Sequence, residues 1–154
     1  MDKTDKKILS LLQENARITN AEIARQVKMV PSGIQERIRK LEDKGYISDY
    51  ATHLKSDHLN LGLLAFIFVR TNESPGGLNS AKELAKLPEI LEVHHVAGED
   101  CYLLKVRHTN NQSLARFIRE KLGKIKTIVN TRTVIVLDTI KETCSLKLPD
   151  NVNN

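Results

Sequence analysis

Hydrophobic residues in the first 45 positions of the chain recur three or four residues apart, which is the spacing of one face of a helix. They are Ile8, Leu9, Leu11 and Leu12, then Ala21, Ile23, Ala24 and Val27, then Ile34, Ile38 and Leu41. Asp2 can cap the first helix, and Thr19 with Glu22 has the spacing of a capping box before the second. Pro31 suits the first turn of the third helix, and Gly45 suits its end. The pattern predicts three short helices.

After Gly45, strand patterns alternate with helical ones. The expected elements are, in order, a strand over residues 46–54, a strand over 63–69, a turn at 74–77, a helix that ends before Pro88, two strands within 92–108 around a turn at Gly98, a helix from Asn111 to a glycine stop at Gly123, and a strand over 127–137. From residue 63 onward this order is β-α-β-β-α-β, the order of the ferredoxin-like fold. The sequence therefore predicts an α+β protein, with three helices followed by a ferredoxin-like domain.

The strand over residues 63–69 is apolar on both of its faces. One face holds Leu63, Ala65, Ile67 and Val69, and the other holds Leu64, Phe66 and Phe68. Because the two helices of a ferredoxin-like domain cover only one face of its sheet, the second apolar face needs another cover. We expect a second copy of the chain to supply it, which predicts at least a homodimer.

The three N-terminal helices fit the helix-turn-helix plan, in which the last helix lies in the major groove of DNA. At about 100° per residue, the apolar residues of the third helix fall on one side. The residues on the opposite side are Ser32, Glu36, Arg39 and Lys40. Gly33 and Ser32 are small enough to let the start of the helix approach a phosphate or a base edge. A three-helix bundle that only mediates protein contacts has the same pattern, so both interpretations remain at this point.

Composition and charge do little to decide between a DNA-binding domain and a bundle that mediates protein contacts. The formal net charge of +5 suits a polyanionic partner, but many proteins that bind no nucleic acid share it. The longest apolar run, residues 61–69, is far shorter than the ~20 residues of a membrane-spanning helix. The start "MDKTDKK" lacks the apolar core of a signal peptide, so we expect a cytoplasmic protein. Cys101 and Cys144 match no multi-cysteine pattern and fit a reduced state, with a disulfide between them left open.

Four stretches, in the right order and spacing, carry a resemblance to a known family. They are "DKTDKKILSLLQENARITNAEIARQV", "VPSGIQERIRKLEDKGYISDY", "NLGLLAFIFV" and "VAGEDCYLLKV". The first resembles the opening D-x-x-D-x-x-I-L of the Lrp/AsnC, or feast-famine, transcription regulators of bacteria and archaea. The second is similar to the recognition-helix segment of that family, and the last two to its effector domain. The resemblance covers roughly residues 2–148.

This resemblance implies a domain organisation and a function. It implies a winged-type helix-turn-helix DNA-binding domain over residues 1–48, a linking strand and hinge over 49–61, a ferredoxin-like effector-binding and dimerisation domain over 62–148, and a polar tail over 149–154. It also implies a sequence-specific regulator of transcription that binds double-stranded DNA without a cofactor. The resemblance also implies that DNA binding or assembly responds to a small effector, typically an amino acid in this family, and that dimers can assemble further into octamers.

The candidate site residues follow from the pattern and the resemblance together. For DNA they are Ser32, Gly33, Gln35, Glu36, Arg37, Arg39 and Lys40. Arg37 sits at the edge of the apolar stripe, where a phosphate contact and an ion pair within the domain are equally good interpretations. For the effector they are Gly98, Glu99, Asp100 and Cys101 in the turn, with Thr131 and Thr133 on one face of the last strand.

Three residues depart from the family pattern. Val30 stands where many members have a Ser or Thr cap, and a valine cannot accept a backbone N–H. Glu36 places an acid on the DNA side, where phosphates repel it but cytosine N4 can donate to it. Cys101 stands at the usual aspartate position of the effector turn, and a small, half-buried hydrophobe is the favoured interpretation over a redox sensor.

Other functions remain to be weighed against the regulator. Haem-pathway decarboxylases share the two-domain layout, but no catalytic Ser-His-Asp or Cys-His arrangement is recognisable in the sequence. A metabolite-binding assembly module with weak DNA binding is a third possibility, to which Val30 and Glu36 point. His94 and His95 are adjacent on an expected strand and so face opposite ways, which argues against a shared metal ion. No metal site is therefore expected.

Overall fold

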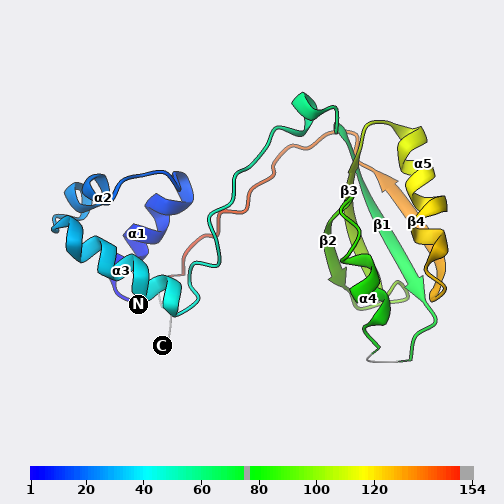
Figure 1. The fold of residues 1–154 in the computed structure, drawn as a ribbon, viewed down its shortest axis with the longest axis horizontal. Coiled ribbons are helices and arrows are strands. Elements are labelled where there is room, and N and C mark those ends of the chain that lie inside the picture. Colours follow the sequence, from blue (N-terminus) through cyan, green and yellow to red (C-terminus); the bar gives the residue numbers. More distant parts are fainter. Residues whose placement is uncertain (75–76, 150–154) are drawn as a thin grey trace. The chain divides into compact units, whose positions relative to one another are not determined.

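The computed structural model describes residues 1–74 and 77–149 (Figure 1). The chain divides into two compact units, each with its own hydrophobic core. The first unit combines residues 1–53 with the C-terminal segment from Lys141, and the second spans Leu54 to Ile140. No helix within the described residues is both long enough and apolar enough to cross a membrane.

Three helices form the first unit: α1 (Lys3–Glu14), α2 (Asn20–Val27) and α3 (Pro31–Asp43). Their core contains the predicted residues Ile8, Leu9, Leu11, Ile23, Ala24, Ile34 and Leu41. Asp2 caps α1 as predicted, and with Asp5 it forms a complete capping box. The capping box predicted for α2 is only half formed. Thr19 accepts from the backbone N–H of Glu22, but the Glu22 carboxylate pairs with Arg25 and Gln26 instead of reaching back.

The second unit contains one four-stranded antiparallel sheet and two helices. Its elements are β1 (Leu63–Thr71), α4 (Asn79–Leu84), β2 (Ile90–His95), β3 (Tyr102–His108), α5 (Asn111–Glu120) and β4 (Ile128–Ile135), with short 3-10 turns at Ser56–Leu59 and Leu122–Lys124. The strand order is β2-β3-β1-β4, which gives the predicted ferredoxin-like topology. The predicted turn at 74–77 lies partly outside the described residues.

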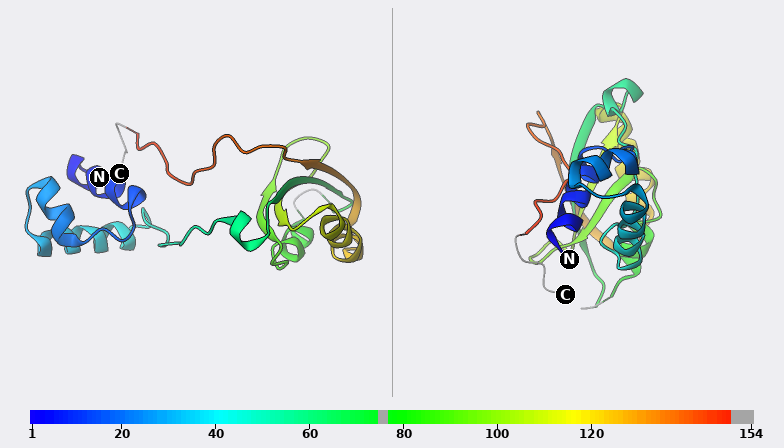
Figure 2. Two further views of the ribbon diagram at one scale, coloured as in Figure 1. Left: turned by 90° about the horizontal axis from the view of Figure 1, so that it is seen from above. Right: turned by 90° about the vertical axis from the view of Figure 1, so that its left-hand side faces the viewer.

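The two faces of this sheet differ, as the sequence predicts. α4 and α5 lie on one face (Figures 1 and 2), where Ala65, Ile67 and Val69 of β1 pack with the alternate residues of β3. Phe66 and Phe68 point to the other face and are only half-buried, although both are large and apolar. Val134, which pairs with Phe66 across β1 and β4, is exposed. The second apolar face is therefore present and is not covered by helices of the same chain.

Two local predictions are wrong. Residues 46–54 form no strand, because a strand needs a neighbour to pair with and this segment finds none within the described chain. Gly123 does not end α5. That helix ends at Glu120, where the N–H of Lys121 bonds to the carbonyl of Phe117, and Gly123 lies inside the following 3-10 turn.

The C-terminal segment from Lys141 groups with the three N-terminal helices, whereas the residues up to Ile140 belong to the second unit. Leu148 packs against their core, and the carbonyl of Pro149 accepts a hydrogen bond from Lys6. Pro149 is therefore part of a folded unit, and the rest of the predicted polar tail, residues 150–154, lies outside the described residues.

Candidate DNA-binding face and effector site

The start of α3 combines an uncapped end with close packing. Val30 occupies the N-cap position without a side-chain hydrogen bond, as predicted, and Pro31 opens the first turn. A Cβ added to Gly33 would lie 3.2 Å from Cε of Met29. A larger side chain at this position would therefore require the end of the Met29 side chain to shift by a few tenths of an ångström.

The outward side of α3 matches the predicted face. Ile34 and Leu41 are buried and Ile38 is partly buried, so the apolar stripe points into the core. The exposed residues on the opposite side are Ser32, Gln35, Glu36, Arg39 and Lys40. We call these five residues the α3 face. It is polar throughout, and two of its residues are cations.

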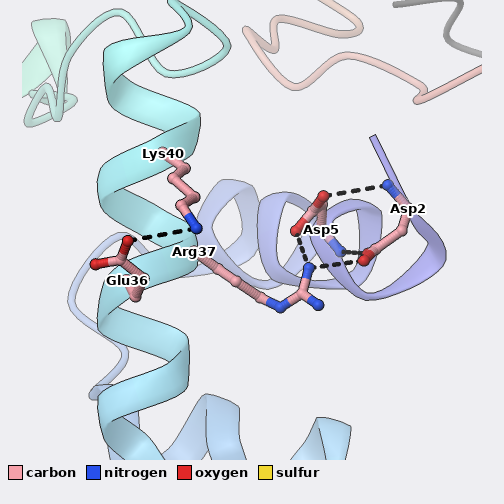
Figure 3. A network of polar contacts seen from close by, with 5 residues as sticks. All are labelled: Asp2, Asp5, Glu36, Arg37 and Lys40. Atoms are coloured by element: carbon pink, nitrogen blue, oxygen red, sulfur yellow. Dashed lines mark hydrogen bonds and ion pairs between the residues drawn. The ribbon is translucent and has the colours of Figure 1, made fainter.

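Glu36 pairs with both cations of the α3 face. Its carboxylate accepts from Nη2 of Arg39 at 3.0 and 3.1 Å. Figure 3 shows its second contact, with Nζ of Lys40 at 3.4 Å. Hydrogen bonds from Arg39 first, and then from Lys40, hold the pKa of Glu36 below its ordinary value. Glu36 is therefore ionised at neutral pH and neutralises part of the positive charge that the face presents.

Arg37 is engaged inside the domain. Its Nη1 lies 2.7 Å from Oδ2 of Asp2 and 2.6 Å from Oδ1 of Asp5, the two residues of the α1 capping box (Figure 3). Of the two interpretations of Arg37, the structure shows the ion pair. The guanidinium thereby ties α3 to the start of α1.

The predicted effector turn brings a carboxylate close to a guanidinium on β4. Gly98 has a φ of +128°, a backbone conformation that favours glycine. Two residues later, Oδ2 of Asp100 lies 3.2 Å from Nη2 of Arg132 on β4. The Arg132 guanidinium also stacks over the ring of Phe68, 3.9 Å from its centroid. Arg132 was not among the predicted site residues. It lies between Thr131 and Thr133 on β4, so its side chain points to the opposite face of the sheet from theirs.

The other predicted effector residues lie in different environments. Cys101 is half-buried against the sheet core, with Sγ 4.0 Å from the carbonyl oxygen of Thr71, as a small hydrophobe would be. Glu99 is exposed. Thr131 and Thr133 pair with Val69 and Ile67 and so share the helix-covered face of the sheet, away from Arg132.

The two strand histidines face opposite ways, as predicted. Nε2 of His94 lies 3.0 Å from Oε2 of Glu92, while the ring of His95 lies 5.3 Å from the ring of Tyr102. Within the described residues, no three side chains of His, Cys, Asp or Glu gather closely enough to hold a metal ion.

Comparison with known proteins connects these two sites to one family. Residues 64–146 match the model of the Lrp/AsnC ligand-binding domain, and residues 1–48 match that of a winged helix-turn-helix DNA-binding domain. The chain belongs to the Lrp/AsnC family. It is a DNA-binding transcriptional regulator of the Lrp/AsnC type, and its fold is the α+β arrangement that the sequence predicts.

Relatives span nearly the whole chain. The Pyrococcus horikoshii HTH-type transcriptional regulator FL11 is 35% identical over 148 residues, which cover 96% of this chain and 97% of the relative. The Klebsiella pneumoniae leucine-responsive regulatory protein is 34% identical over 92% of this chain and 88% of its own. The solved complex of the Neisseria meningitidis regulator NMB0573 with L-methionine superposes with a TM-score of 0.90, at 36% identity and 96% coverage of both chains.

In this Lrp/AsnC chain, the Arg37 contacts predict a stability effect. Replacing Arg37 by methionine removes both ion pairs and is expected to lower the free energy of unfolding at neutral pH by about 1 kcal/mol, because solvent screens the half-exposed Asp2. Urea unfolding measures this change. Lys40→Met is the control, since it removes a charge from a side chain that is 63% exposed and is expected to change stability little.

The same contacts predict a pH dependence. The backbone N–H of Asp5 and then Arg37 lower the pKa of Asp2 below its ordinary value of 3.8. A lowered folded-state pKa means that the stabilisation is present above pH 3.8 and is lost as the pH falls through the folded value. The difference between wild type and Arg37→Met should therefore shrink in acid, and a constant difference would contradict this assignment.

Removing the charge of Glu36 is expected to strengthen DNA binding. Replacing Glu36 by glutamine frees Arg39 and Lys40 and removes a charge that phosphates repel, so affinity for any duplex is expected to rise by about 3- to 10-fold. Affinity is also expected to fall more steeply with salt concentration, as if about one more phosphate were neutralised. Fluorescence anisotropy with a random duplex measures it. Glu14→Gln, an exposed acid at the end of α1, is the control. An unchanged affinity would show that Glu36 does not oppose the phosphates.

Proposed function

We propose that the α3 face enters the DNA major groove and that a homodimer reads two related half-sites. The exposure of Gln35, Arg39 and Lys40 on one side of a helix whose other side is core carries this proposal. Long basic side chains reach phosphates, and Gln35 can pair with an adenine edge. Ser32 and Gly33 allow the helix start to approach the backbone, Glu36 restricts the accepted bases, and Arg37 holds the helix in place.

The uncovered face of the sheet supports the dimer. Phe66 and Phe68 lie at its centre, and Val134 extends it across β4. An apolar face of this kind in water favours self-association, and a second copy presents the same face in return. Symmetry then gives two α3 faces and a roughly palindromic operator. We propose further that four such dimers can close into an octamer.

The effector that fits the turn best is an amino acid. Asp100 can pair with an α-ammonium group and Arg132 with an α-carboxylate, so an amino acid can replace the bond that these two residues make with each other. The turn from Gly98 to Cys101 lies beside this pair and supplies backbone groups. The carboxylate that Cys101 cannot offer is thus supplied by Asp100. The complex of NMB0573 with L-methionine supports this class of ligand.

A thermal-shift screen of the twenty amino acids tests the effector. A ligand at about 100 times its dissociation constant stabilises the folded chain by about 2.7 kcal/mol, which is well within detection. We expect at least one amino acid to raise the melting temperature of the wild type and to leave Arg132→Gln unchanged. Arg119→Gln on α5 is the matched control and should respond like wild type. Equal shifts in both variants would place the effector elsewhere.

Footprinting on genomic fragments tests the DNA proposal. The expected protection is two half-sites whose centres lie one helical turn, about 10 bp, or a multiple of it apart. Uniform protection without preferred positions would contradict specific recognition. We infer that the protein acts in the cytoplasm by binding and not by catalysis. Incubation with sirohaem tests the alternative of a haem-pathway decarboxylase and is expected to give no turnover.

A further inference from the structure

An extended C-terminal segment, residues 146–149, runs along α1 of the DNA-binding domain. The side chain of Gln13 bonds to both backbone groups of Leu146: its Oε1 accepts from the N–H at 2.6 Å and its Nε2 donates to the carbonyl at 3.2 Å. At the other end, Nζ of Lys6 donates to the carbonyl of Pro149 at 2.7 Å. The segment is therefore held at both ends and runs antiparallel to α1.

The spacing of these contacts matches the helix. Lys6 and Gln13 are seven residues apart, a rise of about 10.5 Å along α1. Leu146 and Pro149 are three residues apart, a span of about 10 Å in an extended chain. Between them, Leu148 packs against the core of the three helices, whereas the side chain of Leu146 is 75% exposed. Side chains of α1 thus bind the backbone of the C-terminal segment, and one leucine of the segment packs against the core of the three helices.

We propose that this surface of α1 is a docking site for the C-terminal segment and that the docked segment gives the effector domain a second connection to the DNA-binding domain, held at α1 by non-covalent contacts. The first connection is the link near residue 54, and the second crosses near residue 140. A domain held by one flexible link reaches many positions, while a second link removes most of them. The dimer therefore accepts a narrow range of half-site spacings.

The docking needs little intrinsic affinity. The segment belongs to the same chain, so its effective concentration at α1 is high and a few hydrogen bonds with one apolar contact suffice. Such a contact can also open locally without unfolding the rest of the domain. Leu148 is the residue on which docking depends most, because its side chain is the one from this segment that contacts the core.

Three variants test whether the docked C-terminal segment limits the half-site spacings that the protein accepts. The first ends at Ser145, the second carries Leu148→Asp, and the third carries Leu146→Asp as the matched control. The control keeps the backbone bonds to Gln13 and changes a side chain that is already exposed. Each is measured for its melting temperature and for its affinity to operators whose half-sites are moved apart by about 2 or 5 bp.

Wild type and the control are expected to lose more than about 10-fold in affinity when the half-sites are moved, because both connections resist the new spacing. The truncated chain and Leu148→Asp are expected to lose less than about 3-fold and to melt at a lower temperature. Equal discrimination between spacings by all four proteins would overturn the proposal.

A synthetic peptide of residues 141–154 decides between tethering and mere completion of the fold. Added to the truncated chain, it should restore the melting temperature but not the discrimination between spacings, because it has no covalent link to the effector domain. Restored discrimination would contradict the tether. The inference rests on the proposed two-half-site dimer, and the two fail in different ways. If wild type binds no operator at any spacing, the proposed function is wrong, whereas the peptide-dependent melting change still reports docking.

Discussion

Replacing Arg39 and Lys40 together by alanine is expected to weaken operator binding by roughly 100-fold and to reduce the salt dependence of the affinity by about two phosphates. Both side chains are about two-thirds exposed, at 65% and 63%, and both extend from the α3 face without entering the core. The loss should exceed a simple sum of two contacts. Removing both cations leaves the Glu36 carboxylate unpaired and facing the phosphates.

A matched control tests whether the loss of affinity depends on where the two positive charges lie or only on the net charge. Lys3→Ala with Lys7→Ala removes the same charge from exposed residues of α1 and is expected to change affinity by less than about 3-fold. Circular dichroism checks that both double variants fold. If the α3 variant binds as well as the control, the DNA contacts lie elsewhere, and a metabolite-binding module with weak DNA binding becomes the better description.

Replacing Phe66 by aspartate is expected to convert the proposed dimer into monomers at micromolar concentration and to remove most operator binding. Phe66 lies on the uncovered sheet face, between Lys105 on β3 and Val134 on β4. An unpaired carboxylate buried between two copies costs several kcal/mol, which is comparable to the stability of a modest dimer. A monomer contacts one half-site and loses the gain from holding two.

Sedimentation velocity measures the assembly of this variant. Leu78→Asp is the control, because Leu78 is an apolar residue that is 51% exposed and precedes α4 outside the sheet. The control should sediment like wild type. A Phe66→Asp protein that remains dimeric would show that the interface between copies lies on another surface.

Local patterns in the sequence were sufficient for most of the fold. The apolar spacing of Ile34, Ile38 and Leu41 located both the buried and the outward side of α3, because a helix with this spacing has one inward face. The two-sided apolar pattern of β1 predicted the uncovered sheet face for the same kind of reason. Glu36 was recognised as unusual, and its pairing with Arg39 and Lys40 was readable from spacings of three and four residues.

Contacts between distant parts of the chain were not predictable in this way. The pairing of Gln13 with Leu146 joins residues 133 positions apart, and no periodicity in either segment specifies it. The choice between two roles for Arg37 likewise depended on where the start of α1 lies in space. Arg132 was overlooked because its partner, Asp100, belongs to a different strand connection and the two meet only when β4 pairs with β1.

The most direct test of the central claim, that the α3 face reads DNA sequence, is the ratio of affinities for the selected operator and for a random duplex at physiological salt. Specific regulators typically bind their site at least about 1,000-fold more tightly than other DNA. We expect wild type to reach this ratio and Arg39→Ala with Lys40→Ala to lose affinity for both duplexes. A ratio near one for the wild type would contradict sequence-specific regulation by this protein.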